Sequence, residues 1–296
     1  MKETYFEKLH PALCFAYFAL AICFSALVQH PAYLIANVLG ALCLNISMRG
    51  LAALKRFVCV IPFWLFLSLI NPLLNTLGEH VLFSYWGRNY TLEALCYGMV
   101  ISGMFIAMLE WFTAYNAVMT EDKFSYLFAS LAPSTALLLT TVLRMIPNLM
   151  RKAGQIASAR KSIGMGATEN ASAREKINSG MTTLSALTSW ALEGSVVTSD
   201  SMNSRGYGAG KRTCYHSYRF ACGDACAGAV FSLLLCVFLI GLLRGAGEAE
   251  FTPEMRVTPI TGEMLPSLIA YTLFLLLPTL LNLKEEIQWS ISRSRI

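Results

Sequence analysis

Charged residues are scarce in this sequence. Aspartate, glutamate, lysine and arginine make up only 14% of its 296 residues, whereas a soluble globular domain carries about 25%. The mean hydropathy is +0.53, and 55% of the residues are hydrophobic. This composition excludes a soluble protein. The uncharged runs also lack the apolar and polar alternation of a membrane β-barrel, so their backbone groups must be satisfied within helices.

The sequence also lacks the residue sets that metal or catalytic chemistry needs. It has four histidines, which form no catalytic set. Cys214, His216, Cys222 and Cys226 lie near one another in the sequence, but without the paired C-x₂-C spacing of a structural zinc site. No G-x₄-G-K-[ST] phosphate loop occurs, and the glycine-rich residues 206–211 lack its spacing. Neither a catalytic site, a metal site nor a bound cofactor is predicted for this chain.

Long apolar runs are abundant instead. Stretches of about 18–22 nearly uncharged residues have the length needed to cross the hydrocarbon core of a bilayer. They fall near residues 11–28, 31–47, 57–74, 94–115, 225–243 and 263–283. The expected fold is therefore an all-α polytopic membrane protein. It has about six transmembrane helices and long amphipathic cytoplasmic helices.

The distribution of lysine and arginine predicts the topology, because these residues are enriched in cytoplasmic segments. Of the 23, twelve lie in 116–224 and eight more lie in the two tails and the 48–56 loop. Six spans with both termini in the cytoplasm place all of these segments inside. The expected organisation is four spans in 1–115, a cytoplasmic helical region in 116–224, and two spans with a tail in 225–296. The net charge of +5 reflects this bias and does not indicate nucleic-acid binding.

The region 116–224 reads as three helices. A short one follows Thr120, and a second spans about 134–163, with Arg144 and a proline at Pro147 that is expected to kink it. A third spans about 173–203 and carries Glu193 and Asp200. Apolar residues recur at i, i+3 and i+4 in both long helices, which is the pattern of an amphipathic helix. Glycines should end the third helix at Ser204-Arg205-Gly206 and expose the arginine.

Four motifs occur in a defined order. They are Asn71-Pro72-Leu73 followed by Thr91-Leu92-Glu93-Ala94, Leu143-Arg144-Met145-Ile146-Pro147, Trp190-Ala-Leu-Glu193 with Asp200-Ser201-Met202, and Ser204-Arg205-Gly206-Tyr207-Gly208 with Arg212-Thr213. Their order and content resemble the T component of energy-coupling factor (ECF) transporters, a membrane coupling subunit related to the cobalt-transport permeases. The resemblance covers about residues 60–285, and its most specific element is the small-Arg-Gly signature at 204–206.

The resemblance implies partners and a mechanism. Ser204, Arg205 and Gly206 would enter a groove on one of two cytosolic ABC-type ATPases, while Arg144, Pro147, Glu193 and Asp200 would belong to the supporting coupling helices. ATP would be bound by the ATPases, and cargo by a small membrane substrate-binding (S) subunit. The chain would then be a non-catalytic subunit of an importer in a bacterial plasma membrane. The imported cargo would be a vitamin, a vitamin precursor or a metal ion.

The family usually carries a second small-Arg-Gly signature, at the end of the first coupling helix. This sequence offers two candidates there. Ala159-Arg160-Lys161 keeps the arginine but loses the glycine, whereas Ser162-Ile163-Gly164 keeps the glycine and has isoleucine in place of arginine. Arg160 is therefore predicted as the arginine that contacts the second ATPase.

Two other classes of function are weighed against the coupling subunit. A stand-alone secondary transporter predicts paired broken helices near the midplane and an internal repeat, and neither is evident. A membrane-embedded enzyme predicts acids or histidines that face one another across spans, and Glu110 is the one acid deep in a span.

Overall fold

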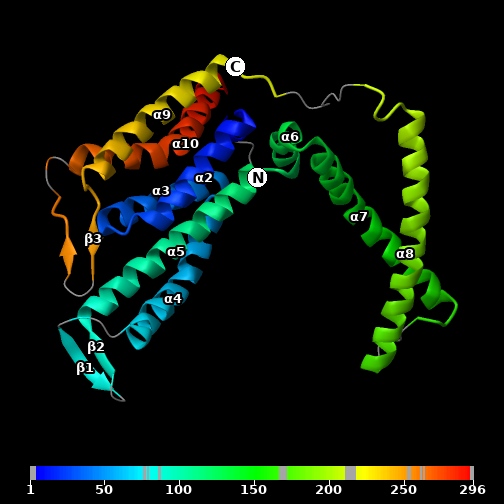
Figure 1. Ribbon diagram of the computed structural model, residues 1–296, viewed down its shortest axis with the longest axis horizontal. Helices are drawn as coiled ribbons and strands as arrows, with labels where there is room; N and C mark the ends of the chain where they lie inside the picture. Colours follow the sequence, from blue (N-terminus) through cyan, green and yellow to red (C-terminus); the bar gives the residue numbers. More distant parts are fainter. Residues whose placement is uncertain are drawn as a thin grey trace. The chain divides into compact units, whose positions relative to one another are not determined.

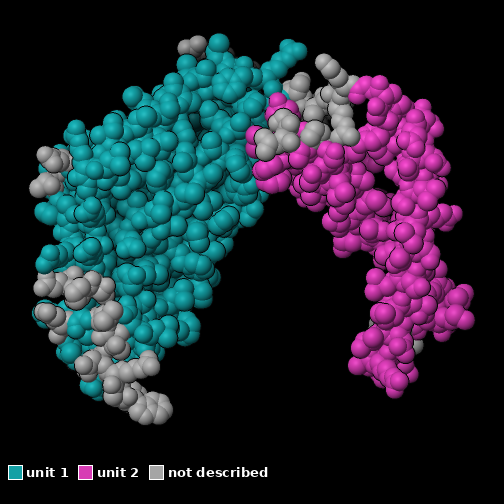
Figure 2. Space-filling view, in the orientation of Figure 1, with its two compact units in different colours: residues 1–120, 218–296 teal, residues 121–217 magenta. Residues whose placement is uncertain are grey.

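The structure is a computed structural model that describes residues 5–75, 78, 80–85, 88–166, 172–210, 218–251, 255–260, 262 and 264–293. The chain divides into two compact units, coloured separately in Figure 2. Unit 1 comprises Met1–Thr120 and Tyr218–Ile296, and unit 2 comprises Glu121–Ser217. Each unit is described by itself.

Unit 1 is a bundle of helices (Figure 1). In chain order these are α1 (Tyr5–Lys8), α2 (Pro11–Leu27), α3 (Pro31–Arg49), α4 (Leu51–Leu74), α5 (Leu92–Val118), α9 (Cys222–Leu243) and α10 (Met264–Arg293). Two antiparallel hairpins accompany them: β1 (Val81–Tyr85) with β2 (Arg88–Thr91), and β3 (Ala249–Glu250) with β4 (Arg256–Val257). Unit 2 holds α6 (Glu121–Leu131), α7 (Pro133–Ser162) and α8 (Ala173–Ser204).

The membrane prediction is confirmed. Within the described residues, α3, α4, α5, α9 and α10 are long and apolar enough to cross a membrane. The first expected span corresponds to α2, an apolar helix of 17 residues, or about 26 Å at 1.5 Å per residue. The chain is an all-α polytopic membrane protein.

A repeated local motif starts α2 and α3. Each helix begins within a His-Pro-Ala sequence. The histidine is the N-cap residue, and the proline takes the first helical position, where its missing N–H is not needed. The backbone N–H of Ala12 donates to Nδ1 of His10 at 3.3 Å, and that of Ala32 donates to Nδ1 of His30 at 3.2 Å. The imidazole therefore caps each helix at the position where serine or aspartate more often does.

Buried polar side chains in unit 1 pair across helices. The indole N–H of Trp111 in α5 donates to Oδ1 of Asn37 in α3 at 2.6 Å, and Nδ2 of Asn37 donates to Ser25 Oγ in α2 at 2.7 Å. The Tyr17 hydroxyl donates to the Leu275 carbonyl at 3.0 Å. These bonds fix the register of four helices, because an unpaired polar group is costly in an apolar interior.

Small residues allow close packing of α10. A Cβ at Gly40 in α3 would lie 2.9 Å from Cβ of Leu275, and a Cβ at Gly241 in α9 would overlap the side chain of Ser267. Helices in a bilayer gain their attraction from such close backbone approach, since lipid tails are as apolar as the side chains. Glycine at these two positions brings α3 and α9 against α10.

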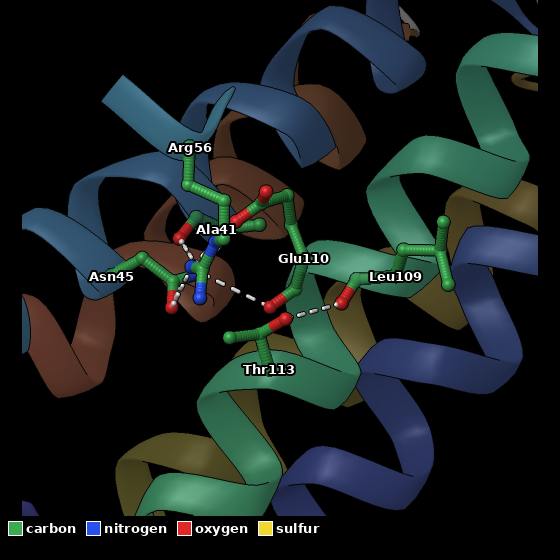
Figure 3. Close-up of polar contacts among 6 residues, drawn as sticks. All are labelled: Ala41, Asn45, Arg56, Leu109, Glu110 and Thr113. Atoms are coloured by element: carbon green, nitrogen blue, oxygen red, sulfur yellow. Dashed lines mark hydrogen bonds and ion pairs between the residues drawn. The ribbon is translucent and has the colours of Figure 1, made fainter. Parts of the chain in front are cut away.

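A cluster of charged and polar side chains lies where α3, α4 and α5 meet (Figure 3). Glu110 is 3% exposed, and its Oε2 accepts from Nδ2 of Asn45 at 3.0 Å. Nη2 of Arg56 lies 3.5 Å from the same oxygen and 3.4 Å from Oδ1 of Asn45. The isolated acid in the sequence is thus the buried member of an ion pair that links α4 to α5, in which the Arg56 side chain is 33% exposed. This pairing gives Glu110 a structural role.

We expect the substitution Arg56→Met to lower the free energy of unfolding in detergent by about 2–3 kcal/mol, because it leaves a buried carboxylate without its cation. Adding Glu110→Gln to that variant should recover most of the loss. Denaturant unfolding of the purified protein measures both.

The matched control is Lys8→Met. Lys8 pairs with Glu285 at 3.1 Å, with side chains 53% and 21% exposed, and an exposed pair contributes below about 1 kcal/mol. Equal losses in the two single variants would contradict the structural role of the buried pair.

Candidate coupling interface

The two long helices of unit 2 cross as an antiparallel pair (Figure 1). The Lys152 ammonium in α7 lies 5.3 Å from the centroid of the Trp190 ring in α8. Two turns further along α7, Arg160 contacts Ser179 and Thr183. The contact in α8 moves back as that in α7 moves forward, so the helices run in opposite directions. The C-terminal ends of α7 and α8 therefore point in opposite directions, and Arg160 holds the end of α7 against α8.

The pair buries little of its own apolar surface. No residue of α8 is buried, and apolar residues such as Leu149 and Ile156 of α7 and Leu187 of α8 are only partly buried. Many aliphatic side chains stay between 46% and 72% exposed: Ile146, Met150, Ile163, Met165, Ile177, Met181, Leu184, Leu192, Val196 and Val197. An exposed apolar area of this kind marks an interaction surface.

Helix α8 begins and ends with strong caps. Ser172 and Glu175 form a reciprocal capping box at its start. At its end, the Gly206 N–H donates to the Asn203 carbonyl at 2.9 Å and the Tyr207 N–H donates to the Met202 carbonyl at 3.0 Å. These two bonds define a Schellman motif, which needs a left-handed residue after the helix. Gly206 supplies it with φ +78°.

The Schellman motif places Arg205 at the end of the rod. Arg205 is the C-cap residue and is exposed. Among the described residues, its guanidinium makes no hydrogen bond or ion pair. The Ser204 hydroxyl donates back to the Asp200 carbonyl at 2.8 Å. Ser204, Arg205 and Gly206 thus form one exposed tip, and Asp200 lies one turn before it.

Arg160, the candidate arginine at the end of α7, lies at the contact between α7 and α8. Its Nη1 donates to the Ser179 carbonyl at 2.8 Å and lies 3.3 Å from Thr183 Oγ1, and its Nη2 donates to the Met165 carbonyl at 3.2 Å. The guanidinium therefore spans the α7–α8 contact and fixes the loop that follows α7. The sequence alone did not reveal this contact, because it depends on the register between two helices.

The other predicted residues lie along α7 and α8, away from the tip formed by Ser204, Arg205 and Gly206. Arg144 and Pro147 are exposed in the middle of α7, which continues on both sides of Pro147. Glu193 is exposed on α8, about three turns before Arg205. Arg212 and Thr213, which follow the signature, lie outside the described residues. The structure thus brings Asp200 and Ser204 to Arg205 and leaves Arg144, Pro147 and Glu193 elsewhere on the pair.

The described residues contain no group of three His, Cys, Asp or Glu side chains that could hold a metal ion. Cys222 and Cys226 are exposed free thiols on α9. Cys214 and His216 of the same sequence cluster lie outside the described residues.

These features define a multi-pass membrane protein that carries a long, amphipathic and largely unburied helix pair. Comparison with protein families identifies the chain further: residues 3–215 match the family described as CbiQ, cobalt transport protein, so the chain belongs to that family. A search among curated proteins returned no match. Membership supports a role in membrane transport.

We expect Arg160→Ala to loosen the α7–α8 contact, because three hydrogen bonds of about 1 kcal/mol each are lost. Amide hydrogen exchange in residues 160–166 and 179–183 should accelerate at least about tenfold, since 1.4 kcal/mol corresponds to a factor of ten. Arg160→Lys should restore little, because an ammonium cannot reproduce the planar fork. Lys161→Ala is the matched control, with the same charge change on an exposed neighbour. Equal exchange in the two alanine variants would contradict the role assigned to Arg160.

Proposed function

We propose that this chain is the transmembrane coupling (T) component of an ECF-type ABC importer. It would join two cytosolic ABC-type ATPases to a small membrane substrate-binding subunit. The observation that carries this proposal is the Arg205 tip: a Schellman motif fixes the backbone of this exposed arginine at the end of a 32-residue helix that has no buried residue.

The first argument concerns burial. A helix pair that exposes many aliphatic side chains gains little stability from its own packing, since helical stability in proteins comes mostly from covering an apolar face. Partner subunits and the bilayer surface would supply that cover. Small and aliphatic side chains suit packing against the helices of a membrane subunit.

The second argument concerns the tip. A guanidinium offers planar donors that can bind a carboxylate in a bidentate manner or bind backbone carbonyls. Arg205 is exposed and unpaired among the described residues, so those donors are available to a groove on another protein. Gly206, which follows Arg205, has no side chain and therefore lets the partner surface approach the backbone.

The third argument concerns energy. The sequence has no phosphate loop, so ATP would be bound and hydrolysed by the partner ATPases and this chain would bind no cofactor. α7 and α8 have 30 and 32 residues, or about 45 and 48 Å at 1.5 Å per residue. Helices of this length would transmit a displacement of their ends to the subunits that pack along them.

The crossing gives this motion a pivot. Closure of the ATPase pair on ATP would move the C-terminal ends of α7 and α8, and the Lys152–Trp190 and Arg160 contacts would convert that movement into a change of crossing angle. The substrate-binding subunit on the exposed faces would then reorient and release a vitamin, vitamin precursor or metal ion. The importer would lie in a bacterial plasma membrane, with both termini of this chain in the cytoplasm.

We expect Arg205→Glu to reduce both ATPase co-purification and ATP-dependent uptake at least about tenfold, because reversing a charge in a complementary groove costs several kcal/mol. Co-purification is measured with the tagged full chain from its native membrane, and Co²⁺ is the first uptake probe. Arg205→Lys should retain part of the ATPase co-purification and part of the ATP-dependent uptake.

Arg174→Glu is the matched control, since it makes the same charge change at an exposed position in the first turn of α8. There a carboxylate is favourable to the helix. If Arg205→Glu assembles and transports like Arg174→Glu, the proposed coupling role of the tip is wrong.

A further inference from the structure

The ends of α7 and α8 share one backbone structure. After α7, the Gly164 N–H donates to the Lys161 carbonyl at 3.1 Å and the Met165 N–H donates to the Arg160 carbonyl at 2.9 Å. This is the Schellman pattern found after α8. The C-cap residues have φ −95° and ψ 13° at Ile163, and φ −84° and ψ 4° at Arg205. The following glycines, Gly164 and Gly206, have φ +76° and +78°.

The side chains before each cap also correspond. Ser162 Oγ donates to the Ser158 carbonyl at 3.1 Å, and Ser204 Oγ donates to the Asp200 carbonyl at 2.8 Å, in both cases four residues back. Ser162-Ile163-Gly164 and Ser204-Arg205-Gly206 are therefore the same structural element, built twice. Ile163 stands where α8 has Arg205.

Arg160 does not replace the missing arginine. It lies one turn before the tip, at the position that Met202 holds in α8, and its three hydrogen bonds direct it onto α8 and the α7 loop. The exposed Lys161 corresponds to Asn203, two residues before the cap position. Neither cation occupies the place of the Arg205 side chain.

The two tips consequently present opposite chemistry. Ile163 and Met165 are each 68% exposed, so the α7 tip offers two aliphatic side chains, whereas the α8 tip offers a guanidinium and Tyr207. A carboxylate groove suited to Arg205 would be desolvated by Ile163 without gaining a hydrogen bond, which is unfavourable. One kind of groove cannot fit both tips well.

We infer that Ser162-Ile163-Gly164 is the second ATPase-docking tip of this chain, that it fits an apolar groove, and that the two ATPase subunits are different polypeptides with chemically different grooves. This inference rests on the proposed function. It assigns Ile163 as the docking residue of α7 and Arg160 as a positioning residue that holds the α7 tip against α8.

Site-specific photo-crosslinking in the assembled complex tests the inference directly. A photoreactive residue is placed at position 163 or 205 of the tagged full chain, and the ATPases attached at each position are identified by mass spectrometry. We expect position 163 to crosslink one ATPase polypeptide and position 205 to crosslink another. Attachment of the same polypeptide at both positions would overturn the inference and leave the proposed function intact. No ATPase at either position would overturn both.

Substitutions test the chemistry of the groove. We expect Ile163→Arg, which restores the family signature, to reduce recovery of the ATPase bound at this tip at least tenfold, while Ile163→Leu retains it. Leu192→Arg is the matched control, since Leu192 is 65% exposed on α8, two residues from Trp190 at the crossing and far along the helix from Arg205. Recovery of both ATPases at wild-type levels with Ile163→Arg would overturn the inference.

Discussion

The Arg160 guanidinium binds two long helices that cover little of each other's apolar surface. Its bonds to Ser179, Thr183 and Met165, with Lys152 over Trp190, fix both the crossing of α7 and α8 and the loop that forms the α7 tip. By helix rise, the α7 end lies about 15 Å from the Lys152 level and the α8 end about 21 Å from the Trp190 level. The positions of both tips therefore depend on a few polar contacts near the crossing. The crossing angle of two helices held by a few polar contacts can change at lower free-energy cost than the packing of a close-packed core, since close-packed cores resist deformation.

Unit 1 is built on the opposite principle. Its polar side chains are paired across helices, as in Trp111–Asn37–Ser25 and Glu110–Asn45–Arg56, and its glycines bring α3 and α9 directly against α10. Hydrogen bonds between helices and close packing of this kind favour a rigid body. A rigid membrane body and an adaptable helix pair are the two parts that a coupling subunit requires, one to stay fixed in the bilayer and one to follow its partners.

Much of this architecture could be predicted from the sequence, because the strongest signals act locally. The absence of charge over 57–74 or 225–243 predicts a membrane helix from its length alone, and the glycines at 164 and 206 predict where α7 and α8 end. The role of Arg160 could not be predicted in this way, because two of its three acceptors belong to a helix that begins thirteen residues further along the chain. Nor could the pairing of Glu110 with Arg56, which depends on how α3, α4 and α5 pack. The equivalence of Ile163 and Arg205 did have a sequence signal, the repeated Ser-x-Gly, but only the two sets of cap bonds establish it.

The central claim is that this chain works as one subunit of an ATP-driven assembly. The most direct test is purification of the tagged full chain from its native membrane in mild detergent, followed by native mass spectrometry of the intact particle. The account predicts one copy of this chain with two ABC-type ATPases and one small hydrophobic membrane subunit. A chain that purifies alone, and that transports alone in vesicles without ATP, would contradict the account and identify a stand-alone secondary transporter.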